Sequence, residues 1–185
     1  MKSIPNILTL TRIILIPIFI IVFYLPISAA HIIAAIIFAL ACATDWWDGY
    51  LARRLQQTTK LGAFLDPVAD KLIVAAALIM IVSLSYLSYV LLPAMVIIGR
   101  EIVVSALREW MAEIGQRAHV AVVMIAKWKT LSQMLAIFCL LAYSPHGNYF
   151  FVIVGYVTLY AATILTLWTM CMYLYAARKA FSEGH

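Results

Sequence analysis

Four aspartates between positions 45 and 70 form two closely spaced pairs. Asp45 and Asp48 are three positions apart, so on a helix they would share one face. Asp66 and Asp70 are four apart and would do the same. Clustered carboxylates repel one another at low dielectric unless cations compensate them, and oxygen ligands favour Mg²⁺, Mn²⁺ or Ca²⁺. The pattern therefore predicts a carboxylate cage for two divalent ions, suited to a displacement at phosphorus.

Small residues and one arginine accompany the acids. Gly49, Ala52 and Gly62 lack bulky side chains, so a ligand or a neighbouring helix can approach the backbone there. Arg53 follows Gly49 by one helical turn and can grip a phosphate with its forked guanidinium. The alternative is that the acids are paired interfacial charges and the small residues serve helix packing. Burying four carboxylates without a cation is so costly that the metal site is the favoured interpretation.

The elements that must position these groups are hydrophobic helices. The 185 residues are 66% hydrophobic and 11% charged, with a mean hydropathy of +1.02, which is more apolar surface than a soluble domain of this size can bury. The net charge of +5 would suit nucleic-acid binding only in a soluble protein. The three cysteines lie far apart within apolar runs. These features favour a membrane protein without a disulfide framework.

The charges divide the sequence into alternating segments. Residues 13–44, 72–99 and 130–177 carry no charge, and each stretch is typical of two helices joined by a short loop. Because lysine and arginine lie only between these stretches and at the two ends, the positive-inside rule places both termini and the active site in the cytoplasm. The prediction is an all-α integral membrane protein of the bacterial inner membrane, with residues 1–185 as one catalytic domain. Its six transmembrane helices are expected at 7–25, 31–56, 66–88, 91–114, 119–143 and 149–176.

The acids and their neighbours together match a family signature. Asp45, Asp48, Gly49, Ala52, Arg53, Gly62, Asp66 and Asp70 fit D-x2-D-G-x2-A-R-x8-G-x3-D-x3-D, so the sequence resembles the CDP-alcohol phosphotransferase family. The resemblance implies that an alcohol oxygen attacks the β-phosphorus of a CDP-activated donor and CMP leaves. It also implies two Mg²⁺ or Mn²⁺ ions on the four aspartates, with Asp70 as the base, and a homodimer. Gly49, Ala52, Arg53 and Gly62 would line the CDP pocket.

Three further patches resemble the bacterial branch that joins CDP-diacylglycerol to sn-glycerol 3-phosphate: Asn6–Arg12, Gly99–Glu109 and Lys127–Gln133. A doubly charged acceptor needs its own cationic pocket, and Arg100, Lys127 and Lys129 are the candidates for it. Arg100 could instead pair with Asp66, Asp70 or Glu101. Asn6, Thr9 and Arg12 are candidates for a donor contact, or for capping and anchoring the first helix at the headgroups.

Two other functions remain open. The same chemistry could serve another acceptor, namely phosphatidylglycerol to give cardiolipin, inositol phosphate or serine. In a different class, the acids could translocate cations in a small ion-coupled transporter, although the sequence shows no inverted repeat or paired broken helices of the kind such carriers have.

Overall fold

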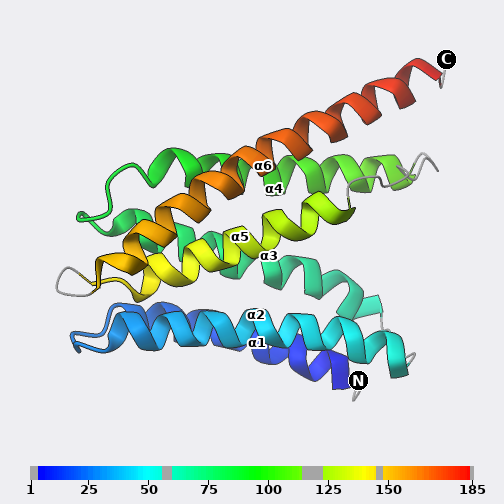
Figure 1. Ribbon diagram of the computed structural model, residues 1–185. Coiled ribbons are helices and arrows are strands. Elements are labelled where there is room, and N and C mark those ends of the chain that lie inside the picture. The colour runs from blue at the N-terminus through cyan, green and yellow to red at the C-terminus, as the bar shows by residue number, and fades with distance from the viewer. Residues whose placement is uncertain (1–3, 56–59, 114–122, 145–147, 184–185) are drawn as a thin grey trace.

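The computed structural model describes residues 4–55, 60–113, 123–144 and 148–183. Within these ranges it describes every side chain except those of 4–9, 45–55, 60, 61, 63, 64, 108, 112, 113, 123–127, 176, 177 and 179–183. The described residues form six helices and no strand: α1 Ile4–Phe23, α2 Ala30–Leu55, α3 Lys60–Ser83, α4 Leu91–Glu113, α5 Val123–Ala142 and α6 Tyr149–Glu183 (Figure 1). The all-helical prediction is confirmed, and each predicted span overlaps one helix.

The third helix differs most from its predicted range. We expected it at 66–88, whereas α3 begins at Lys60 and ends at Ser83. Asp66 and Asp70 therefore lie in the second and third turns rather than at the helix start. Pro67 falls inside the helix, where its missing N–H and its ring weaken the turn that precedes it.

The helix α3 ends at Ser83 although the residues that follow it are still largely apolar. Tyr89 has a φ of 64°, in the left-handed region that bulky residues seldom adopt. The hydroxyl of Tyr160 on α6 donates to the Tyr89 carbonyl at 3.1 Å, and that of Tyr156 donates to the Ser88 carbonyl. Two tyrosines of α6 thus hold this connection, a contact between distant residues that helical periodicity does not encode.

The helices run back and forth between two ends of the molecule. The connections at 24–29 and 84–90 and the start of α6 lie at one end, and the start of α1 and the end of α6 lie at the other (Figure 1). No charged residue occurs in 24–29, 84–90 or 143–148. The charges therefore gather in the half of the bundle that contains the start of α1 and the end of α6, as the alternating sequence pattern predicts.

The core is apolar and closely packed. Phe19, Phe38 and Leu140 are among its fully buried side chains. A Cβ added to Gly155 would lie 2.7 Å from the Leu140 side chain, so glycine lets α6 approach α5 closely. The outward surface is apolar as well, with Ile21 63% and Ile164 66% exposed.

Among the described residues, one helical stretch is both long and apolar enough to cross a membrane on its own. It is Tyr149–Tyr175 in α6, with a mean hydropathy of 2.1. Shorter apolar stretches occur at Leu10–Phe23, Ala30–Thr44 and Trp128–Ala142. The charged residues that we assign to the site lie at the ends of these stretches, for example Asp45 directly after Thr44, and they shorten the apolar runs.

Candidate active site

A cavity of about 330 Å³ lies in the charged half of the bundle. Five helices contribute to its wall: Arg12 comes from α1, Ala41 from α2, Asp66 from α3, Glu101 from α4 and Gln133 from α5. Ionisable groups inside a helix bundle are costly unless they pair or face a polar space. Their convergence makes this cavity the candidate site.

The second aspartate pair lines the cavity from α3. Asp66 and Asp70 are one helical turn apart and both reach it, together with Lys71. Asp45 and Asp48 belong to the last turns of α2, but their side chains lie outside the described residues, so the convergence of the two pairs stays a prediction. The predicted roles of Gly49, Ala52 and Arg53 in the CDP pocket also stay predictions, because these residues lie in the part of α2 whose side chains are not described. Gly62 is described and buried in the first turn of α3.

Arg12 brings α1 into the site. Its side chain is only 1% exposed, and its Nη1 donates to Asp70 Oδ1 at 2.5 Å. Asp70 stays 41% exposed, because one side of its carboxylate faces the cavity. This burial favours a role for Arg12 in the cavity over anchoring at lipid headgroups, which would require exposure. The side chains of Asn6 and Thr9 lie outside the described set.

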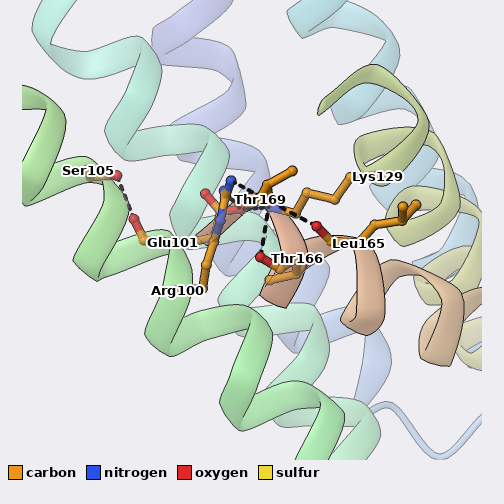
Figure 2. A network of polar contacts seen from close by, with 7 residues as sticks. All are labelled: Arg100, Glu101, Ser105, Lys129, Leu165, Thr166 and Thr169. Atoms are coloured by element: carbon orange, nitrogen blue, oxygen red, sulfur yellow. Dashed lines mark hydrogen bonds and ion pairs between the residues drawn. The ribbon is translucent and has the colours of Figure 1, made fainter. Parts of the chain in front are cut away.

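Two of the three predicted acceptor-binding cations meet at Glu101 (Figure 2). Lys129 Nζ donates to Glu101 Oε1, and Arg100 Nη1 reaches the same oxygen at 3.2 Å. Glu101 in turn lines the cavity. The ion pair that we considered as an alternative for Arg100 is therefore present with Glu101. Lys127 belongs to α5, but its side chain is not among those described.

The guanidinium of Arg100 is held from a second side by α6 (Figure 2). Its Nη2 donates to Thr169 Oγ1 at 3.1 Å, while the Thr169 hydroxyl donates to the backbone carbonyl of Leu165 or Thr166 at 2.9 and 3.0 Å. Tyr173 places its ring centroid 6.0 Å from the guanidinium carbon, within the range of a cation–π contact. Arg100 is thus oriented by α4 and α6 together.

Sequence reasoning gave no role in the site to Gln133 or Thr169, and it named Glu101 only as a buried charge and a possible partner of Arg100. Glu101 carried a usable signal, because a carboxylate at that depth in a bundle is costly without a partner. Gln133 lay in a patch that resembles the family, but its own side chain is uncharged and gave no electrostatic signal. Thr169 had no signal, because threonines are common in apolar helices and their hydroxyls usually bond to their own backbone.

The described residues suit a divalent ion without completing its ligand set. Asp66 and Asp70 supply carboxylate oxygens on one helix face beside an open cavity, which are the donors that Mg²⁺ and Mn²⁺ prefer. No group of three or more metal-binding side chains occurs in the part of the chain whose side chains are described. The remaining ligands would have to come from Asp45 and Asp48.

Comparison with known proteins identifies the family. The model of the CDP-alcohol phosphatidyltransferase family matches residues 2–170. The chain belongs to that family. The resemblance inferred from the aspartate signature is therefore confirmed, and this phosphatidyltransferase can be compared with its relatives along nearly its whole length.

Curated relatives share about half of the phosphatidyltransferase's residues. A CDP-diacylglycerol–glycerol-3-phosphate 3-phosphatidyltransferase of Haemophilus influenzae is 51% identical over 182 residues, which covers 98% of this chain and 97% of the relative. Proteins of the same name are 52% identical in Sodalis glossinidius, covering 98% of both chains, and 56% identical in Pseudomonas fluorescens, covering 95% of this chain and 90% of the relative. The similarity is therefore full-length.

Proposed function

We propose that this phosphatidyltransferase transfers the phosphatidyl group of CDP-diacylglycerol to sn-glycerol 3-phosphate, giving phosphatidylglycerophosphate and CMP. The observation that carries the proposal is full-length similarity to relatives named for this reaction, in a chain whose signature acids Asp66 and Asp70 line one cavity. Its product would be a phospholipid precursor. The reaction needs a base, a charge-compensated donor site and a cationic acceptor site, and groups for these roles lie on the cavity wall or contact Glu101, which lines it.

Asp70 is the proposed base. Its carboxylate accepts the proton of the acceptor's primary hydroxyl while that oxygen bonds to the β-phosphorus, and the bond from phosphorus to the CMP oxygen breaks. Arg12 fixes one carboxylate oxygen at 2.5 Å, so the exposed side of Asp70 stays directed to the cavity. Preorganised groups of this kind act without rearranging during the reaction.

Asp45, Asp48, Asp66 and Asp70 are the proposed ligands of two Mg²⁺ or Mn²⁺ ions. When bound, such ions neutralise pyrophosphate charge and stabilise the leaving group. Support comes from Ala41 and Cys42, which line the cavity from α2, because Asp45 follows Ala41 by four positions along the same helix. Gly49, Ala52, Arg53 and Gly62 are proposed to accommodate the CDP group, as the family motif implies.

Arg100, Lys127 and Lys129 are proposed to bind the acceptor's phosphate. Support comes from Arg100 and Lys129, which converge on Glu101 at the cavity wall. A phosphate that approaches this wall would offer the two cations three charged oxygens in place of one carboxylate. Glu101 would then act as the counter-ion of the pocket while it is empty.

We also propose that the six helices span the bacterial inner membrane, with both termini and the cavity on the cytoplasmic side, and that the protein is a homodimer as its family resemblance implies. The apolar outer surface supports the membrane proposal, because a soluble bundle would present polar side chains at such positions. The uncharged connections at one end support the orientation.

A product assay tests the proposal. Purified protein in detergent with CDP-diacylglycerol and Mg²⁺ should release CMP and form phosphatidylglycerophosphate when glycerol 3-phosphate is added. Parallel reactions with phosphatidylglycerol, inositol phosphate and serine should give far less lipid product. If one of these acceptors gave the main product instead, the acceptor assignment would be wrong and the transferase class would stand. Cation flux without CMP release would favour the alternative function, a small ion-coupled transporter.

A further inference from the structure

Gln133 is a buried polar side chain that the mechanism above does not use. It lies on α5, is only 6% exposed, and lines the same cavity as Asp66 and Asp70. Its amide makes no hydrogen bond to any residue whose side chain the structure describes, although it offers two donors and one acceptor. Buried polar groups are nearly always paired, so an amide with open bonding capacity at a cavity wall points to a ligand.

The position of Gln133 matches one part of the proposed acceptor. It follows Lys129 by four residues, so it lies one turn, or ~6 Å, farther into the bundle on the same face of α5. A three-carbon phosphate with its anionic end near Lys129 would extend inward along this face towards Asp70. Its middle hydroxyl, between the phosphate and the reacting hydroxyl, would then lie at the level of Gln133.

The chemistry of an amide suits a hydroxyl at this point. A hydroxyl both donates and accepts a hydrogen bond, and a glutamine amide can reciprocate in both directions without adding charge. A lysine or a carboxylate would instead favour an anion or a metal ion, and the cavity already has both kinds of group. The neutral amide is therefore fitted to a neutral polar group of the substrate.

We propose that Gln133 is a specificity-determining residue that binds the middle hydroxyl of the acceptor and thereby selects a vicinal diol phosphate. The inference rests on the proposed function and adds the recognition of a second hydroxyl to it. An acceptor without this hydroxyl would leave the buried amide unpaired, and sites built to bond a substrate hydroxyl reject analogues that lack it.

The test compares glycerol 3-phosphate with 3-hydroxypropyl phosphate, which keeps the phosphate and the primary hydroxyl but lacks the middle one. The wild-type protein should prefer glycerol 3-phosphate by roughly tenfold to a hundredfold in kcat/KM. In Gln133→Met, which keeps the length of the side chain but loses its hydrogen bonds, the preference should fall to near one. The kcat/KM for glycerol 3-phosphate should decrease, whereas that for 3-hydroxypropyl phosphate and the KM for CDP-diacylglycerol should not change.

Thr163→Val is the matched control. Thr163 is half-buried on α6, bonds to the carbonyl of Leu159 in its own helix at 2.8 Å, and is not part of the cavity wall. Its replacement should leave the acceptor preference unchanged. Gln133→Asn provides a second variant for the case in which Gln133→Met does not fold. It withdraws the amide by one methylene and should reduce the preference without removing it.

The ratio of the two acceptors is unaffected by a general folding defect, which lowers both activities alike. A wild-type protein that used both acceptors equally well would overturn the inference without any variant. So would a Gln133→Met protein with the wild-type preference, or one in which only the KM for CDP-diacylglycerol changed. If the wild-type protein used neither phosphate, the proposed function itself would fail, and this result differs from each of the three outcomes above.

Discussion

Arg12 and Asp70 are 58 positions apart and form an ion pair at the wall of the cavity. At the scale of single residues this contact explains why an arginine is tolerated in the first apolar helix, because a buried cation needs a nearby anion. It also shows what the sequence can and cannot reveal. The aspartates could be found from spacing alone, whereas the partner of Arg12 depends on packing between helices that the sequence does not encode locally.

Replacing Asp66 or Asp70 by asparagine should reduce kcat by orders of magnitude. Each variant removes one negative charge from the proposed metal cage, and Asp70→Asn also removes the base. EDTA should abolish wild-type activity, and Mg²⁺ or Mn²⁺ should restore it. CMP release provides the measurement, and Glu109→Gln is the control, because Glu109 is an exposed acid on α4 away from the cavity wall. Full activity in EDTA would refute the metal mechanism.

Replacing Arg12 by methionine should lower kcat by about tenfold to a hundredfold, because Asp70 would lose the donor that orients its carboxylate. Arg12→Lys should retain more activity, since it restores the charge but only part of the geometry. The two variants should be compared by steady-state kinetics after their thermal unfolding midpoints have been shown to be similar. If Arg12→Met kept the wild-type kcat, the arginine would have a purely structural role.

At the scale of helices, α6 contributes to a site whose motifs lie on other elements. Thr169 holds Arg100 from α6, and Tyr156 and Tyr160 of the same helix hold the connection before α4. Helix existence and order could be predicted from hydrophobic stretches and charge spacing. The bounds of α3 could not, because the residues after Ser83 are still largely apolar and the turn depends on the tyrosine contacts.

Thr169→Val should raise the KM for glycerol 3-phosphate severalfold and leave kcat nearly unchanged. Valine has nearly the same shape as threonine but cannot accept the hydrogen bond from Arg100, and a bond to a charged group contributes about 1.5–3 kcal/mol. Part of the affinity for glycerol 3-phosphate should be retained, because Arg100 keeps its contact with Glu101. Thr169→Ser preserves the hydroxyl and should behave like the wild type. A selective rise in the KM for CDP-diacylglycerol would instead connect this network to the donor.

At the scale of the whole molecule, one end of the bundle is charged and the other is not. The exposed serines at positions 28 and 85 lie in two uncharged connections, and Glu109 lies in the last turns of α4. The last turns of α4 lie at the opposite end of the bundle from these connections (Figure 1). The alternation of charge along the sequence predicted this arrangement. It could be predicted because each helix reverses the direction of the chain, so that alternate connections share an end.

The proposed orientation can be tested by labelling cysteines in a background without Cys42, Cys139 and Cys171. In intact cells, cysteines introduced as Ser28→Cys and Ser85→Cys should react with a membrane-impermeant maleimide. Glu109→Cys should react only after the membrane is permeabilised. Labelling of Glu109→Cys in intact cells would contradict the placement of the charged half in the cytoplasm.

The location of the cavity in the charged half of the bundle has a consequence for how a membrane grows. In the proposed orientation, glycerol 3-phosphate enters and CMP departs through the cytosol, so newly made lipid is deposited in one leaflet only. The two leaflets would then expand unequally unless lipids are moved across the bilayer. A single enzyme with a one-sided entrance thus creates a demand for transbilayer lipid transport that scales with its own turnover.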